Sequence, residues 1–253
     1  MTHGLTHRLY VDRDSPVHRL PAECKIAAVL SFVLVVVATP PTEYAAFACF
    51  ALLLVAVTAL ARVPLRVVVP RLVVETPVVV FALLLPFVAE GRRTEVIGLS
   101  LSVSGLLSSW NVVAKATVGV LASILLAATT SQRDLLVGLQ RLKVPALVVQ
   151  IVAFMVRYID VIADQMARMR LARAARGFVP RGPRSWPVLA RSAGALFIRS
   201  FERGERVHLA MLSRGYTGAL PELSGQRGTL RAWASAAALP LAAVVTLAVS
   251  VAR

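Results

Sequence analysis

The sequence has few charged and few aromatic residues. Charged residues make up 16% and aromatic residues 6% of the 253, whereas 57% are hydrophobic. Soluble proteins average about 45–50% apolar residues, so this composition excludes an ordinary soluble domain. Acidic residues are scarcest: 13 Asp and Glu stand against 28 Lys and Arg, a formal net charge of +15. No globular remainder is large enough to form a separate nucleic-acid reader, so the excess cations are expected in cytoplasmic loops of a membrane protein.

The sequence also lacks the motifs of common ATP-binding and hydrolytic sites. It contains no G-x-x-x-x-G-K-[ST], and its three lysines, Lys25, Lys115 and Lys143, lie outside Gly-rich loops, which excludes a P-loop ATPase. Neither H-E-x-x-H nor G-x-S-x-G occurs. Cys24 and Cys49 show no C-x-x-C spacing, so we expect apolar packing rather than a disulfide or a metal site.

The histidines do not form a metal-binding pattern. His3, His7 and His18 cluster in a polar N-terminal segment, which seldom makes a specific metal site, and His208 lies within a predicted helix. We therefore assign no metal ligand and no catalytic residue. A membrane-embedded enzyme remains a distant alternative, because the predicted spans hold essentially Glu75 and Lys115 as charged candidates.

Five apolar runs predict an all-α integral membrane protein with about five transmembrane helices. The runs lie near residues 25–39, 44–61, 72–89 and 106–129 of an N-terminal membrane bundle (1–129), and in a C-terminal transmembrane helix within 229–253. A bilayer span takes about 20 residues, so the first run is short. We expect no removable signal peptide, a cytoplasmic N-terminus, an external C-terminus and an external loop over 90–105. Lys115 should face the bundle interior, since a lipid-facing ammonium is costly.

Residues 130–228 have a different character. Between Arg133 and Arg231, 17 Lys and Arg stand against 6 Asp and Glu, so this stretch is predicted to be cytoplasmic. It contains two candidate amphipathic helices, near 145–177 and 186–215. Asp160 and Asp164 in the first are interpreted as partners of intrahelical ion pairs.

Each candidate helix carries a stripe of residues spaced three and four apart. The first stripe, expected to pack against the rest of the protein and to continue into Arg173 and Arg176, is Val148, Ile151, Met155, Tyr158, Ile162, Met166 and Met169. The second, whose small residues would let another helix cross closely, is Leu189, Ala193, Leu196, Ser200, Gly204, Val207 and Met211.

Both helices end with the same pattern, ARGF at 175–178 and SRGY at 213–216. A glycine after the last turn adopts the left-handed conformation that caps a helix, and the preceding arginine lies near the negative end of the helix dipole. A single Arg-Gly pair is common capping. Two copies, each at the end of a long striped helix, favour a docking role for the arginines in acidic pockets of a partner.

These paired endings resemble those of the T components of energy-coupling-factor transporters, over nearly the whole chain. The segments 15–21 (SPVHRLP) and 135–145 also look like features of that family. The resemblance implies two crossed cytoplasmic coupling helices that dock on two ABC-type ATPase subunits, and a separate membrane S component that captures the substrate. By resemblance, the ATPase-docking residues are Arg173, Ala175, Arg176, Gly177, Ser213, Arg214 and Gly215.

The resemblance also implies what this chain does and does not bind. No cofactor is expected in the chain itself, because ATP would be bound by the partner subunits. The sequence of residues 205–218 (ERVHLAMLSRGYTG) most resembles the cobalt-type, CbiQ-like branch of the family. Cobalt uptake across a prokaryotic cell membrane is therefore the expected role. A T component shared among vitamin-specific S components is the nearer alternative. Ser213 departs from a strict Ala-Arg-Gly but keeps a small residue before the arginine.

Overall fold

The computed structural model describes residues 10–11, 13–90, 93–96, 99–179, 182–217 and 228–251. The chain divides into two compact units. The bundle unit comprises Leu9–Gly138 and Ser224–Arg253, and the hairpin unit contains Leu139–Leu223. The described residues are predominantly helical, as expected for an all-α membrane protein.

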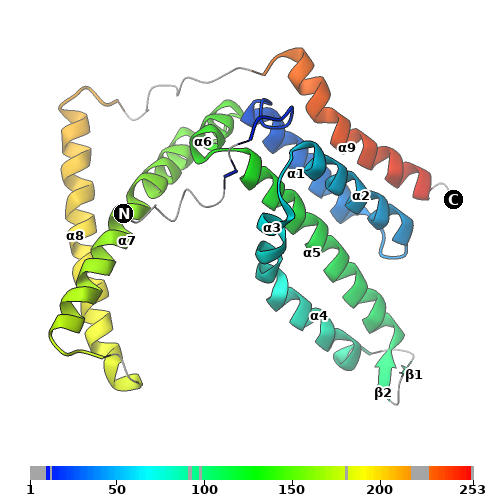
Figure 1. Cartoon of the computed structure of the whole chain (residues 1–253), viewed down its shortest axis with the longest axis horizontal. Helices are drawn as coiled ribbons and strands as arrows, with labels where there is room; N and C mark the ends of the chain where they lie inside the picture. Colours follow the sequence, from blue (N-terminus) through cyan, green and yellow to red (C-terminus); the bar gives the residue numbers. More distant parts are fainter. Residues whose placement is uncertain are drawn as a thin grey trace. The chain divides into compact units, whose positions relative to one another are not determined.

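The bundle unit is built from apolar helices around one core (Figure 1). Its helices are α1 (Ala22–Ala38), α2 (Tyr44–Leu60), α3 (Leu65–Val68), α4 (Thr76–Val88), α5 (Val103–Thr129), α6 (Gln132–Arg141, which continues into the hairpin unit) and α9 (Leu230–Val251). Helix α1 packs on α5 and α9, and α2 packs on α5. Phe32 of α1 and Phe50 of α2 are fully buried with ring centroids 5.9 Å apart, which fixes these two helices across the core.

The third apolar run is a broken helix. Helix α3 precedes it, and a 3-10 segment (Val69–Glu75) leads into α4. Pro70 and Pro77 lie in the first turns of these elements, where a missing backbone N–H is tolerated. Glu75 at the junction is buried and accepts a 2.6 Å hydrogen bond from the Thr117 hydroxyl of α5. The carboxylate is thereby partnered inside the bundle.

The segment predicted as an external loop, residues 90–105, contains a β-hairpin. Strands β1 (Arg93–Val96) and β2 (Leu99–Ser102) are antiparallel, with Arg93 opposite Ser102. Helix α5 begins directly after β2, three residues before the predicted start, and the Ser102 hydroxyl accepts a 3.4 Å hydrogen bond from the Gly105 amide. Local backbone pairing and a serine cap therefore order part of this loop.

Four helical segments of the described residues are long and apolar enough to cross a membrane. They are Arg66–Val88, Val103–Thr129, Ala146–Ala175 and Leu230–Ser250. Helices α1 and α2 have 17 residues each, about 25 Å. The segment Ala146–Ala175, which the sequence analysis assigns to the cytoplasm, is among the four because residues 146–156 carry no charge.

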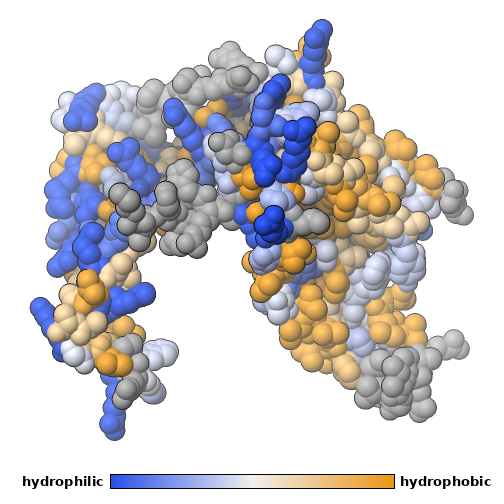
Figure 2. All heavy atoms as spheres, viewed as in Figure 1, coloured by the Kyte–Doolittle hydropathy of each residue, from blue (hydrophilic) through white to orange (hydrophobic). Residues whose placement is uncertain are grey.

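Lys115 is the charged side chain within the predicted fourth span. Its side chain is half-buried, and its ammonium donates a 2.8 Å hydrogen bond to the carbonyl of Val37, near the end of α1. The lysine thus turns toward a neighbouring helix, in the direction that the cost of a lipid-facing ammonium predicts. Figure 2 shows hydrophobic residues over much of the visible face of the bundle unit.

Candidate docking surface at two helix ends

The hairpin unit is dominated by two long helices, α7 (Ala146–Ala175) and α8 (Trp186–Leu212). Pro145 precedes α7 and Pro187 lies in the first turn of α8, positions that suit proline. The chain reverses direction between them (Figure 1). The Gln150 amide in the first turns of α7 donates a hydrogen bond to the Tyr216 hydroxyl, so the C-terminal end of α8 lies beside the N-terminal end of α7.

The C-terminal end of α7 is closed by a Schellman motif. The Phe178 amide donates to the Arg173 carbonyl at 3.0 Å, and the Gly177 amide donates to the Ala174 carbonyl at 2.9 Å. Gly177 has a φ of 74°, in the left-handed region that favours glycine. These bonds satisfy the last carbonyls of the helix and place Arg176 at its cap.

The C-terminal end of α8 repeats this geometry in the same register. The Tyr216 amide donates to the Met211 carbonyl at 3.0 Å, and the Gly215 amide donates to the Leu212 carbonyl at 3.0 Å. Gly215 has a φ of 83°. Arg214 therefore occupies the position at α8 that Arg176 occupies at α7, so the two endings are equivalent in three dimensions as well as in sequence.

The equivalent residues are also equally accessible. Arg176, Gly177, Arg214 and Gly215 are exposed, whereas the aromatic residue after each glycine is half-buried. Tyr216 lies against the ring of His208, with centroids 6.3 Å apart. Tyr216 thus holds the second ending against its own unit, and the guanidinium donors of both exposed arginines are accessible.

The two endings lie at opposite ends of the hairpin. Arg176 follows α7 at the turn, and Arg214 follows the 27 residues of α8 that lead away from this turn. A helix of that length spans about 40 Å. The two arginines are therefore too far apart to share one pocket, and they present two separate contact points.

Within the hairpin unit, the first stripe is only partly covered. Val148, Ile151, Met155 and Ile162 are exposed, with Met155 at 64%. Tyr158, Met166 and Met169 are half-buried. The 3.6-residue spacing identified an apolar face of α7 but not what covers it, because helix periodicity carries no information about the neighbour.

The second stripe is also partly covered, and α8 has a further apolar face that the sequence analysis missed. Leu196 is buried, Ser200, Val207 and Met211 are half-buried, and the remaining three are exposed: Leu189, Ala193 and Gly204. On the adjacent face, Phe197 and Phe201 are 71% and 61% exposed. The spacing of four residues between these phenylalanines could have indicated this second apolar face from the sequence. In Figure 2 hydrophilic residues cover much of α7 and α8, but apolar ones interrupt them.

Both ring nitrogens of His18 lie within hydrogen-bonding distance of other groups of the protein. Its Nδ1 lies 2.8 Å from the Ser15 hydroxyl and its Nε2 lies 3.0 Å from the Val11 carbonyl, so both ring nitrogens are occupied by protein groups. His3 and His7 lie outside the described residues. Among the residues that the structure describes, no group of three or more His, Cys, Asp or Glu side chains is arranged to hold a metal ion.

A family model and one characterized relative indicate the same family. The family model described as CbiQ, cobalt transport protein, matches residues 13–226. The chain is 31% identical over 213 residues to the cobalt transport protein CbiQ of Rhodobacter capsulatus, with 81% of each chain covered. It is 27% identical over 173 residues to an uncharacterized protein of Methanocaldococcus jannaschii, covering 65% of this chain and 59% of that protein.

A second uncharacterized protein of Methanocaldococcus jannaschii is 32% identical over 100 residues, covering 40% of this chain and 37% of that protein. The chain thus spans less than two-thirds of the length of these two Methanocaldococcus relatives, in contrast to the 81% of CbiQ that it spans. The family match includes both helix endings, since Arg176 and Arg214 fall within residues 13–226.

Proposed function

Because the chain belongs to the CbiQ family of cobalt transport proteins, we propose that it is the transmembrane T subunit of an energy-coupling-factor importer. The family and the long apolar helices make it a multi-pass protein of a prokaryotic cell membrane. The observation that carries the proposal is the pair of equivalent arginine-glycine endings at opposite ends of one helical hairpin.

Each ending is suited to bind an acidic groove of an ATPase subunit. The guanidinium of Arg176 or Arg214 presents five N–H donors in a planar fork, which matches the geometry of carboxylates. The Schellman motif fixes where the helix stops and therefore where the arginine stands. The proposed docking sites also include Arg173, Ala175 and Ser213. The two small residues, Ala175 and Ser213, let the partner approach each helix end.

Two separate contact points support docking on two ATPase subunits. When ATP binding draws these subunits together, each pulls on one end of the hairpin, and the stiff helices α7 and α8 transmit the motion to a membrane S component. The chain itself is non-catalytic in this scheme, and ATP is bound and hydrolysed by the partners. The name of the Rhodobacter relative supports cobalt as the transported ion.

Charge reversal at the two caps tests the docking assignment. We expect Arg176→Glu or Arg214→Glu alone to weaken ATPase binding about 10-fold to 100-fold, because each removes a charge-assisted contact of roughly 1.5–3 kcal/mol. The double variant should lose binding. Binding of a tagged ATPase subunit to the detergent-solubilised chain would be measured by titration.

Arginines within the same helices provide matched controls. Arg168 of α7 and Arg199 of α8 are exposed and lie away from the caps. Arg168→Glu and Arg199→Glu change the net charge by the same amount, so they should leave ATPase binding within about twofold of the wild type if the caps are the contact points. Equal losses in the cap and control variants would show a general attraction to the basic hairpin and would overturn the assignment.

A further inference from the structure

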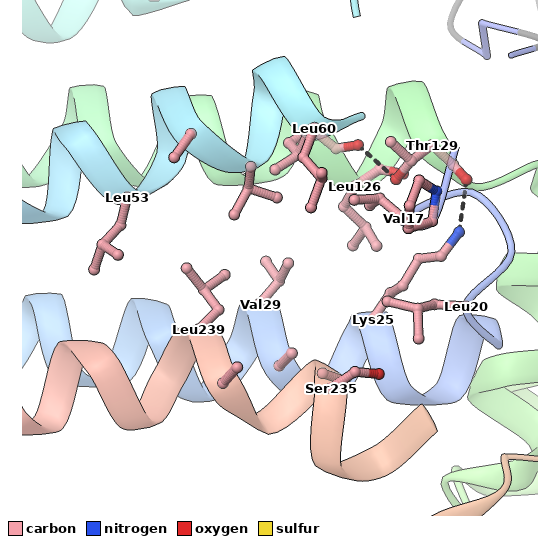
Figure 3. A pocket seen from close by; sticks show the side chains of 17 residues that line it. Val17, Leu20, Lys25, Val29, Leu53, Leu60, Leu126, Thr129, Ser235 and Leu239 are labelled. Atoms are coloured by element: carbon pink, nitrogen blue, oxygen red, sulfur yellow. Dashed lines mark hydrogen bonds between the residues drawn. The ribbon is translucent and has the colours of Figure 1, made fainter. Parts of the chain in front are cut away.

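The bundle unit contains an open cavity of about 580 Å³, outside the helix endings discussed above. It lies between α1 and α9 on one side and α2 and α5 on the other (Figure 3). Helices α2 and α9 contact each other where the Thr246 hydroxyl of α9 reaches the Cys49 sulfur of α2, at 3.8 Å. The cavity lies toward the opposite ends of these two helices, where Leu60 of α2 and Ser235 of α9 line it.

The cavity is polar at one end and apolar elsewhere. Its polar lining residues are Lys25, Thr129 and Ser235. They come from the first turns of α1, the end of α5 and the first turns of α9, whereas Leu53 and Leu239 lie farther along the helices (Figure 3). The lining therefore changes from polar to apolar along the direction of the helices.

This polarity matches the orientation of a membrane lipid. The polar end of the cavity is also the end of the bundle where Arg19, Arg62 and Arg133 lie, because α1 begins, α2 ends and α5 ends there. Basic residues at the end of a bundle of spans lie at the level of the lipid phosphates. The apolar end then lies at the level of the acyl chains.

Lys25 places a positive charge in the cavity wall. It is only 7% exposed, and its ammonium donates hydrogen bonds to the carbonyls of Thr129 at 2.7 Å and His18 at 3.2 Å. These bonds use two of its three protons. Lys25 forms no salt bridge with any residue that the structure describes. The carboxylate of Asp134 acts on Lys25 only through space, so the third proton of the ammonium stays available to an anion that enters the cavity.

The charges near the mouth of the cavity are also mainly positive. Asp14 is bound by Arg19 through two hydrogen bonds of 2.8 and 2.6 Å. These bonds and the charge of Arg19, with a weaker contribution from Arg62, hold the pKa of Asp14 below its usual range. Asp14 is therefore already compensated, and Arg62 and Lys25 remain as the cations that an entering phosphate would meet.

We propose that this cavity binds an anionic phospholipid, with an acyl chain between α2 and α9 and the phosphate against Lys25. The volume lies in the range of small-molecule sites, about 300–1,000 Å³. The cavity has an apolar wall for the chain and a cation at the level of the headgroup. The site lies entirely within the bundle unit, so the proposal is independent of ATPase docking.

Lipid titration monitored by native mass spectrometry tests the site. The full chain would be delipidated in mild detergent and titrated with phosphatidylglycerol or with phosphatidylcholine of the same acyl chains. We expect one tightly bound phosphatidylglycerol, with a dissociation constant about tenfold lower than that of phosphatidylcholine, because the anionic headgroup gains a charge-assisted contact.

Two substitutions on α2 separate the cavity from the general lipid surface. Ala56 lines the cavity and is exposed within it, so Ala56→Phe fills the space without disturbing a packed core. Val55 is 61% exposed and is not part of the lining, so Val55→Phe adds a ring on the other side of the same helix. Ala56→Phe should weaken phosphatidylglycerol binding at least tenfold, and Val55→Phe should leave it unchanged.

Lys25→Gln tests the headgroup contact separately. It should reduce phosphatidylglycerol binding to the level of phosphatidylcholine, and the thermal midpoint reports whether the variant folds. If Lys25→Gln does not fold, the comparison of Ala56→Phe with Val55→Phe still tests whether the lipid binds in the cavity. Equal affinity of the wild type for both lipids, equal effects of the two α2 variants, or occupation of the cavity by a co-purified polypeptide would overturn the proposal.

Discussion

The left-handed glycines at the two helix ends give a quantitative test of docking. Gly177 and Gly215 have φ values of 74° and 83°, and an added Cβ would meet nothing within 4 Å at either position. A substitution there meets no steric clash with neighbours, so its cost is confined to the backbone conformation. An L-residue in the left-handed region costs about 1–2 kcal/mol.

Gly215→Ala should therefore loosen the cap without unfolding the hairpin. If the ATPase binds only the capped ending, restoring the cap on binding costs this same 1–2 kcal/mol, and affinity falls roughly 5-fold to 30-fold. Gly215→Asn should lose less, because asparagine tolerates the left-handed region better. Titration of the solubilised variants with an ATPase subunit measures the difference.

Gly194 is the matched control on the same helix. It has no positive φ, and an added Cβ meets nothing within 4 Å. Gly194→Ala should stabilise α8 by up to about 1 kcal/mol and leave ATPase affinity unchanged. If Gly215→Ala binds the ATPase as well as Gly194→Ala does, the capped geometry plays no part in docking and the reasoning fails.

Two further predictions concern the bundle unit, both measured as thermal midpoints of the solubilised chain. An added Cβ at Gly105 would lie 2.7 Å from the Pro86 Cα, so Gly105→Ala should destabilise by about 1–3 kcal/mol, whereas Gly119→Ala, in open space on the same helix, should be neutral or stabilising. Equal midpoints would refute the close approach of α4 and α5. Replacing Glu75 by Gln keeps an acceptor for Thr117 and should cost little, but Glu75→Leu should cost about 1–3 kcal/mol. A smaller loss for Leu than for Gln would contradict the hydrogen bond.

The helix endings were predictable because their determinants are local. A glycine after a long periodic segment specifies a left-handed cap, and both Gly177 and Gly215 adopt it. The pairing of two equal endings was visible in the sequence for the same reason. Their separation along the hairpin was not, because it depends on the direction of α8 relative to α7.

Features that depend on distant parts of the chain escaped prediction. Lys25 appeared in the sequence as the start of a short apolar run, but its ammonium binds a carbonyl 104 residues away. Helix α6 was not assigned, since its ten residues mix charged and apolar side chains, and Gly138 within it approaches the first turn of α1. The apolar runs identified which segments are helical, whereas the cavity between them depends on how far α9 diverges from α2.

Helices α7 and α8 both carry exposed apolar faces. Met155 and Phe197 are 64% and 71% exposed in this chain alone. Large apolar side chains exposed to this extent on a helix face are typical of a protein or membrane contact. In the proposed T subunit, these faces are available to the S component, while the arginine caps are available to the ATPases.

The most direct test of the central claim is affinity purification of the tagged chain in a mild detergent, with every co-purifying protein identified by mass spectrometry. The account predicts P-loop ATPase subunits together with a small cobalt-type membrane protein, and loss of the ATPases alone in the Arg176→Glu, Arg214→Glu double variant. Recovery of an intact complex without any ATPase, or of the ATPases with the double variant, would contradict it.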